Sequence, residues 1–257
     1  MHFSILFHNF AKGKLHLGII AQASLASSAL AYTLFRHNNS NMNINRLIGT
    51  FFKDQEPSPM IEVFDKENVY STYRDIVSIL NYNPDIELTI LQGLSYCFYE
   101  ILDNVLTHSE KECGTVLMSY HDDEKKIQIL VADDGIGIRK SLSANPKYSN
   151  ISEEEALTMC IEDSVTDGKG MGFGLYSTLR LVNNVGSIMK IVSGDNMLVC
   201  DSSGVNVENT SFWQGTIVYI ELHSNKEIMP EEILGNKTNC VADYNDMFDG
   251  DGLDELW

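Results

Sequence analysis

The sequence has little positive charge. Its 257 residues include 18 lysines and arginines against 36 aspartates and glutamates, which gives a net charge of -18 at pH 7. A protein that binds a nucleic-acid backbone needs clusters of lysine and arginine to pair with the phosphates. We therefore expect no direct contact with nucleic acid. The acidic balance does not exclude a small phosphorylated ligand, because local groups and a bound cation dominate such a site.

Paired cysteines are also missing. The cysteines are scattered, odd in number and form no Cys-x-x-Cys pair; they are Cys97, Cys113, Cys160, Cys200 and Cys240. This pattern argues against a zinc site and against a disulfide framework. We expect reduced thiols, as in a cytoplasmic protein.

A long, purely apolar run is absent as well. Gly18–Phe35 carries no charge and is just long enough to suggest a membrane span, but Gln22 and several serines interrupt it. Lys12 and Lys14 precede it, so a secretory signal is another alternative. We favour a buried or partner-packed helix of small residues, and we expect no membrane association.

Changes in composition divide the chain into three regions. Pro57 and Pro59 mark the end of a mostly helical N-terminal extension, residues 1–57. Residues 58–225 form the predicted main domain. Residues 226–257 end in an acidic segment with interleaved aromatic residues, a composition typical of disorder. We expect a protein partner to dock on the extension or the tail, and a homodimer is a further arrangement that we consider.

Hydrophobic periodicity predicts alternating helices and strands in the main domain. Helices are expected over Val69–Leu80, Leu88–Thr107 and Leu175–Asn183, and a further helix from Ser152, which forms a capping box with Glu155, to near Ser164. Strands are expected over Met60–Phe64, Thr115–Tyr120, Lys126–Ala132, Ser187–Val192, Met197–Cys200 and Thr216–Leu222.

The long helix carries the first candidate functional residues. Glu100, Asn104 and His108 are spaced four apart, so a helix places them on one face, opposite an apolar stripe. A carboxylate can take a proton from a water molecule, and an amide oxygen is a ligand that suits Mg²⁺. A solvated acidic face is the alternative interpretation, and we assign His108 to helix-end packing.

A strand that ends in a carboxylate supplies the second candidate. The predicted strand Lys126–Ala132 continues directly into Asp133, followed by Asp134, Gly135, Ile136 and Gly137. The glycines permit a tight turn and let a flat ligand approach closely. A carboxylate at that position can accept a hydrogen bond from an exocyclic amine such as that of adenine. An ordinary Asp-Gly turn is the alternative.

A glycine-dense loop before a helix supplies the third. Gly168, Gly170, Gly172 and Gly174 alternate, and Lys169 adds a cation beside them. Main-chain N–H groups at a helix N-terminus make an anion site. No Gly-Lys-Ser/Thr sequence ends the loop, so it is not a Walker loop. A flexible loop without a ligand is the alternative.

In this order, and closed by Gly215-Thr216 at the last predicted strand, the motifs resemble those of the GHKL superfamily, the ATP-binding fold of gyrase, heat-shock chaperones, histidine kinases and MutL. The resemblance covers roughly residues 60–223. It implies an α/β fold, a two-layer α+β sandwich of the Bergerat type, with helices covering one face of a mixed, mainly antiparallel sheet. ATP and Mg²⁺ are the implied ligands.

The resemblance also implies a role for each motif residue. Glu100 matches the position that activates the attacking water in the hydrolysing branches, and Asn104 matches the Mg²⁺ ligand. Asp133 matches the carboxylate that binds the adenine amino group. The remaining implied contacts are Gly135 and Gly137 beside the adenine, Gly170, Gly172 and Gly174 in the phosphate lid with Lys169 beside them, and Thr216 on the adenine side.

The motifs indicate less clearly to which branch of the GHKL superfamily the sequence is most similar. The histidines upstream of the domain, His8, His16 and His37, are not followed by an acidic residue as a phosphoacceptor histidine usually is. The compact domain most resembles the anti-sigma-factor serine kinases and related stand-alone bacterial ATP-binding proteins, including histidine-kinase-like ATPase domains. We therefore expect an ATPase or a protein-serine kinase that acts on a protein partner. The alternative is an ATP-gated interaction or dimerisation module with little turnover, for example in a bacterial stress or defence assembly.

Overall fold

The computed structural model describes residues 43–52, 59–170 and 172–234. The predicted helix at Gly18–Phe35 and the acidic segment at 243–257 lie outside these ranges. Within them, no helix is both long enough and apolar enough to cross a membrane. The four cysteines in the described ranges, Cys97, Cys113, Cys160 and Cys200, are free thiols, as expected.

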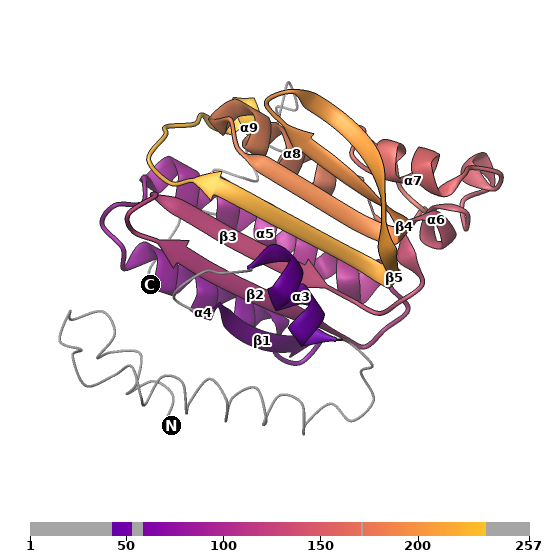
Figure 1. The fold of residues 1–257 in the computed structure, drawn as a ribbon, viewed down its shortest axis with the longest axis horizontal. Coiled ribbons are helices and arrows are strands. Elements are labelled where there is room, and N and C mark those ends of the chain that lie inside the picture. The colour runs from indigo at the N-terminus through magenta and orange to yellow at the C-terminus, as the bar shows by residue number, and fades with distance from the viewer. Residues whose placement is uncertain (1–42, 53–58, 171, 235–257) are drawn as a thin grey trace.

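A five-stranded sheet with the strand order β1-β2-β3-β5-β4 forms the centre of the molecule (Figure 1). All four strand pairs are antiparallel, where the resemblance implied a mixed, mainly antiparallel sheet. The strands are β1 (Met60–Asp65), β2 (Cys113–His121), β3 (Lys126–Ala132), β4 (Ile188–Asp201) and β5 (Gly204–His223).

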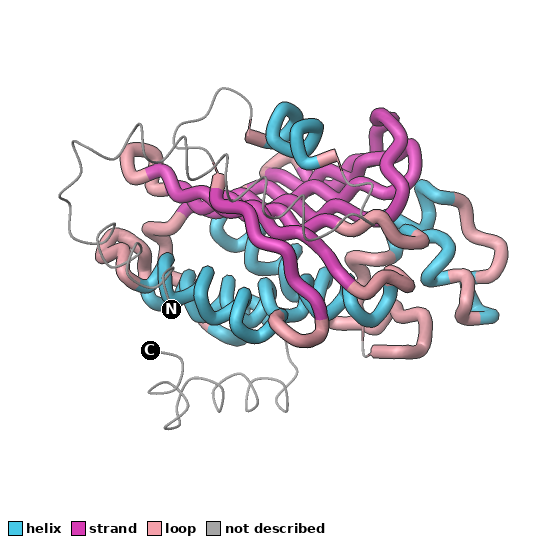
Figure 2. Tube along the Cα trace, turned by 90° about the horizontal axis from the view of Figure 1, so that it is seen from below, coloured by secondary structure: helices cyan, strands magenta, loops and turns pink. Residues whose placement is uncertain are grey.

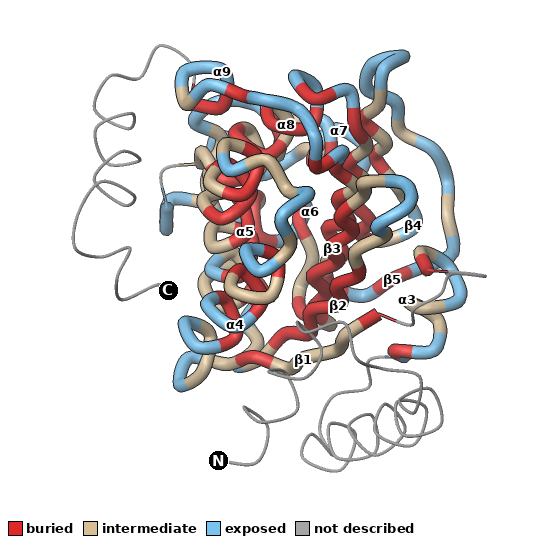
Figure 3. Tube along the Cα trace, turned by 90° about the vertical axis from the view of Figure 1, so that its left-hand side faces the viewer, coloured by how far each residue is buried: buried red, intermediate tan, exposed pale blue. Residues whose placement is uncertain are grey.

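Helices pack in a layer on one face of this sheet (Figure 2). They are α4 (Val69–Asn81), α5 (Leu88–His108), α6 (Gly137–Leu142), α7 (Glu153–Met159), α8 (Gly174–Val185) and α9 (Pro230–Leu234), with a short 3₁₀ turn, η1, at Pro146–Tyr148. The apolar stripe of α5, including Phe98, Ile101 and Leu102, is buried in the main core. Figure 3 shows the buried residues concentrated between α5 and the strands. The two-layer sandwich is confirmed.

A short helix lies on the opposite face of the sheet. α3 (Ile44–Phe51) begins at the side-chain cap of Asn43, and it buries Leu47 in a second apolar cluster with Trp213 and Tyr219. The sheet is therefore covered on both faces over part of its area (Figure 3). The predicted division of the chain at residues 57 and 225 stays a prediction, and both flanking regions supply a helix, α3 and α9, that packs on the domain.

Several element boundaries differ from the predicted ones. The strands predicted at Ser187–Val192 and Met197–Cys200 are one strand, β4, with an irregular register around Gly194. β5 begins at Gly204, twelve residues before the predicted start, because its polar first half pairs with β4 instead of entering the core. α7 begins at the predicted capping box and ends at Met159, before the predicted end near Ser164.

Candidate functional site

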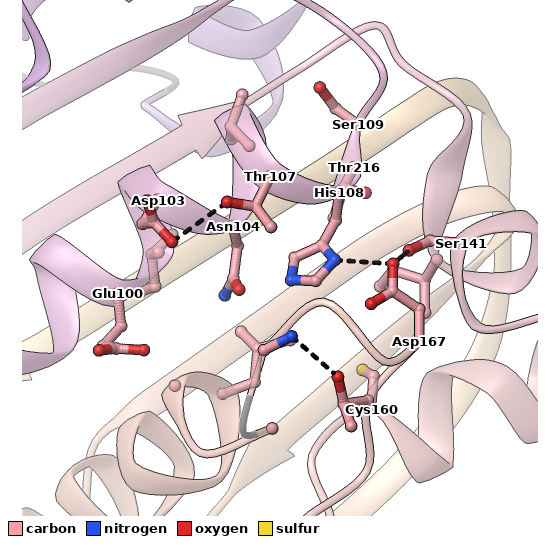
Figure 4. Close-up of a pocket in the computed structure, with 18 of the residues that line it drawn as sticks. Glu100, Asp103, Asn104, Thr107, His108, Ser109, Ser141, Cys160, Asp167 and Thr216 are labelled. Carbon is pink, nitrogen blue, oxygen red and sulfur yellow. Dashed lines mark hydrogen bonds and ion pairs between the residues drawn. The ribbon is translucent and has the colours of Figure 1, made fainter. Parts of the chain in front are cut away.

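A cavity of about 200 Å³ opens between the C-terminal half of α5, the turn after β3, α6 and the loop before α8. We call residues 166–173 the lid loop; residue 171 lies outside the description. Figure 4 shows Glu100, Asn104 and His108 on one side of this space, and Asp167 and Ser141 across from His108. Every predicted site residue lines the cavity except Gly135, which lies in the turn beside it. The helix spacing thus brings the predicted groups together.

The first turn of α8 directly faces Glu100 and Asn104. A Cβ atom on Gly174 would lie 3.0 Å from the Glu100 Cβ and 3.3 Å from the Asn104 Nδ2. Glycine at this position therefore lets the two helices approach closely. The N-cap residue Phe173 makes no side-chain capping hydrogen bond, and no acidic residue lies in the first turn of this 12-residue helix. The N-terminus of α8 therefore lies at the cavity beside the amide and the carboxylate, and the N–H groups of a helix N-terminus can form an anion site.

Glu100 lies in a partly buried position on this face. Burial, together with the nearby Asp103 carboxylate, raises the pKa of Glu100 above its ordinary value. A carboxylate with a raised pKa is a stronger proton acceptor than one in bulk water. The position therefore suits a general base.

Asp133 is buried at the end of β3, with 3% of its surface exposed. Its Oδ1 accepts a hydrogen bond of 2.8 Å from the Gly135 N–H, and its own N–H donates to the Thr216 carbonyl at 2.9 Å. Burial raises the pKa of Asp133 to about 7, although hydrogen bonds from the Gly135 and Thr216 main chain act in the opposite direction. Thr216 thus contacts Asp133 through its main chain.

The turn after Asp133 is attached to the C-terminal end of α5. The Ile136 N–H donates to the Ser109 carbonyl at 2.9 Å, and Gly135 packs so closely on Ser109 that a side chain would collide with it. Glu100 lies nine residues before Ser109, which is roughly 14 Å along a helix axis. The cavity therefore has two ends, with Asp133 near the end of α5, and with Asn104 about one turn and Glu100 about two turns earlier on that helix.

The lid loop takes its shape from a glycine that no other residue can replace. Gly172 has a φ of +73°, and a Cβ there would collide with the main chain of Val165. The Gly172 carbonyl accepts a hydrogen bond from the Ser164 N–H. At the other end of the loop, the Asn145 side chain donates to the Thr166 carbonyl at 3.1 Å. Both ends of the loop are thus fixed to the chain before it.

The first half of the lid loop is bound to α5 and α6 by a polar cluster. His108 Nδ1 lies 2.8 Å from Asp167 Oδ2, and the Ser141 hydroxyl donates to the same oxygen at 3.0 Å. Burial works to raise the pKa of Asp167, but hydrogen bonds from the Lys169 N–H and from His108 outweigh it and lower that pKa overall. Lys169 Nζ donates to the Thr107 carbonyl at 3.3 Å. The lid loop is therefore closed against the helix.

His108, Asp167 and Ser141 are site residues that the sequence analysis missed or set aside. His108 was assigned to helix-end packing, yet it lines the cavity and binds the lid loop. Its spacing of four from Asn104 was the available signal. No signal pointed to Asp167 as its partner, because 59 positions separate the two.

The donor set at Glu100 and Asn104 fits Mg²⁺ in a particular way. The described residues contain no group of three or more histidine, cysteine, aspartate or glutamate side chains that could hold a metal ion. Mg²⁺ characteristically takes one or two protein oxygens and completes its shell with water and substrate phosphates. The Asn104 side-chain amide, which lies beside the N-terminus of α8 and offers one oxygen, is consistent with that kind of site.

An α/β sandwich with a helix N-terminus at one end of a cavity and a buried carboxylate at the other has the layout of a nucleotide-binding domain. The chain matches the model of the histidine kinase-, DNA gyrase B- and HSP90-like ATPase family over residues 90–226 and belongs to this family. The match includes every predicted site residue, and the resemblance to the GHKL superfamily is confirmed. No curated protein matches the chain.

Proposed function

We propose that this protein binds ATP with Mg²⁺ and acts as an ATPase or a protein-serine kinase on a protein partner. The observation that carries the proposal is the arrangement of Glu100 and Asn104 against the first turn of α8. A proton acceptor, an oxygen ligand for a cation and a set of main-chain N–H donors lie together there. Phosphoryl transfer needs these three elements, since its catalysis is chiefly positioning and charge stabilisation.

Glu100 is the proposed catalytic residue. Its raised pKa favours proton uptake. In the ATPase version it accepts the proton of a water molecule, and in the kinase version it accepts the proton of a serine hydroxyl on the partner. Mg²⁺ held by Asn104 would neutralise phosphate charge. Gly170, Gly172 and Lys169 on the lid loop, and the α8 N-terminus that begins at Gly174, would surround the phosphates.

Asp133 is the proposed contact for the adenine base. Its buried carboxylate is fixed by the Gly135 and Thr216 main chain, and Gly137 lines the same end of the cavity. The exocyclic amine of adenine is a hydrogen-bond donor, so it pairs with the ionised carboxylate. Gly135 keeps the turn compact beside the base.

A specific observation also favours the ATP-gated interaction module. The lid loop is bound to α5 and α6 by the contacts of Asp167 with the His108 and Ser141 side chains. A nucleotide that entered the cavity would contact this loop, and a change in its contacts would alter the surface that a partner or a second copy meets. The N-terminal extension and the acidic tail are the proposed docking segments. In this version turnover is incidental.

The test follows the γ-phosphate of labelled Mg-ATP with purified protein, alone and with host lysate. Glu100→Gln is the test variant. Glu62→Gln is the matched control, because burial also raises the pKa of Glu62 although it lies on β1, away from the cavity. Released phosphate that Glu100→Gln loses and Glu62→Gln retains would support the ATPase. Label on another protein would support the kinase.

Binding and turnover are separated by one further variant. Asn104→Ala should remove the Mg²⁺-dependent part of ATP affinity. Binding of ATP without any transfer would favour the gated module, and native mass measurement with and without ATP would then detect assembly. Unchanged Mg²⁺-dependent affinity in Asn104→Ala would refute the site assignment.

A further inference from the structure

A buried tryptophan on the far face of the sheet is bonded to the proposed base-binding residue. Trp213 has 5% of its surface exposed, and its indole Nε1–H donates to the Asp133 main-chain carbonyl at 2.9 Å. A buried indole N–H needs an acceptor, and here the acceptor is the peptide of the residue whose carboxylate faces the cavity. The other Asp133 hydrogen bonds, with Gly135 and Thr216, use main-chain groups of those residues.

The next residue of β5 makes a parallel contact. Gln214 Nε2 donates to the Asp134 carbonyl at 3.3 Å. Two consecutive side chains of one strand therefore hold two consecutive carbonyls of the turn. Gly215 then passes so close to Asp133 that a side chain would collide with it. The turn that carries the proposed base contact is thus built against residues 213–216.

Helix α3 holds the tryptophan from the outside. Arg46 Nη1 and Nη2 donate to the Phe212 and Ser211 carbonyls, each at 2.7 Å. The Arg46 guanidinium carbon lies 5.3 Å from the centroid of the Trp213 ring, which is a cation–π distance. Leu47 of the same helix shares an apolar cluster with Trp213. Helix α3, which lies outside the 90–226 family match, is therefore connected to Asp133 through the Trp213 side chain.

We propose that Trp213 and Arg46 are positioning residues for base recognition. Trp213 holds the Asp133 peptide so that its carboxylate faces the adenine amino group. Arg46 fixes the indole in that position, and both side chains lie on the face of the sheet that carries α3. Selectivity for adenine then depends on a helix that never touches the nucleotide. This inference rests on the proposed function, because it needs adenine to bind at Asp133.

The test compares two ligands in four proteins. ADP and purine riboside diphosphate carry the same phosphates, but the second lacks the 6-amino group. The ratio of their dissociation constants, measured by calorimetry, reports contact with that amine. Trp213→Phe keeps an aromatic side chain, although a smaller one, and removes the N–H donor. Tyr219→Phe is the matched control, because it also removes a buried hydrogen-bonding group from β5 in the same cluster but does not touch Asp133.

Wild type should prefer ADP by about tenfold or more, as expected for a hydrogen bond to a charged group. Trp213→Phe should lower this preference about tenfold, and Tyr219→Phe should leave it unchanged. Arg46→Met acts from the surface and tests the inference even if Trp213→Phe fails to fold; it should lower the preference about threefold. A role in stability alone would weaken both ligands equally and leave the ratio unmoved.

Two results would overturn the inference while leaving the proposed function intact. One is an unchanged ratio in Arg46→Met and in folded Trp213→Phe. The other is an equal fall of the ratio in Tyr219→Phe, which would assign the effect to general loosening of the sheet. A wild-type protein that binds neither diphosphate would instead refute the proposed function, and this inference with it.

Discussion

Lowering the pH from 8 to 6 should weaken adenine-specific binding by about tenfold through Asp133. The adenine amine donates a hydrogen bond, so it needs the carboxylate form of this residue. Burial raises the pKa of Asp133 to about 7. With that pKa, roughly ten sites in eleven are ionised at pH 8 and roughly one in eleven at pH 6. Affinity should follow the ionised fraction, and the factor of ten corresponds to about 1.4 kcal/mol.

The assay must separate Asp133 from the phosphates, which also titrate in this range. The ADP to purine riboside diphosphate affinity ratio does so, because both ligands carry the same phosphates and only one carries the amine. Calorimetric titrations at pH 6, 7 and 8 should show the preference for ADP rising with pH in wild type. In Asp133→Asn the preference should be small and flat. A wild-type ratio that stays constant across this range, or a slope that survives in Asp133→Asn, would refute the reasoning.

Three further results are expected. Since the pKa of Asp133 is higher in the folded protein than the ordinary 3.8, protonation stabilises the fold below about pH 4, and this contribution is lost as the pH rises through about 7. Asp133→Asn should therefore raise the Tm of the nucleotide-free protein at both pH values, and the rise measured by calorimetry should be larger at pH 8 than at pH 5 by about 5 °C. An equal rise at both pH values would contradict this. Gly172→Ala should reduce ADP affinity at least about tenfold, because its positive φ and its collision with the preceding loop forbid a side chain. Gly170→Ala, whose Cβ would meet only His108 Nε2 at 3.8 Å, should fold normally and change that affinity less, and equal losses would argue against the lid geometry. Asp167→Asn should speed ADP dissociation about tenfold in stopped-flow measurements by removing the charge that binds His108, and an unchanged rate would show that the loop is held in another way.

The main elements of the fold were predictable wherever the local pattern and the tertiary environment agree. α5 buries one stripe and presents the other to the cavity, so its 3.6-residue period is visible in the sequence. The boundaries of β3 were predicted correctly because its ends coincide with a polar hairpin and the Asp133 turn. Ser152 and Glu155 form the capping box that their spacing indicates. The order of the motifs was then sufficient to identify the family.

The remaining elements depend on contacts between distant parts of the chain. The first half of β5 is largely exposed, and its apolar alternation is limited to Val205 and Val207, so pairing with β4 determines its conformation. His108 looks like a helix-end residue until Asp167 is brought to it across the lid loop. The link from Arg46 to Trp213 joins positions more than 160 residues apart, on the face of the sheet away from the main helix layer. Periodicity carries no information about such pairs.

Asp133 and Glu100, at the two ends of one cavity, share one physical property, a carboxyl group with a raised pKa. Burial raises the pKa of both carboxyl groups. Each is therefore a better proton acceptor, and each lowers the stability of the nucleotide-free protein at neutral pH. Their proposed roles are separable, because Asp133 acts in binding and Glu100 in turnover. At saturating ATP, the pH dependence of kcat reports groups in the nucleotide complex. The fall in kcat toward acid pH should therefore persist in Asp133→Asn, in steady-state phosphate-release assays between pH 5 and 8. If the fall in kcat disappeared in Asp133→Asn, the proton acceptor would not be Glu100.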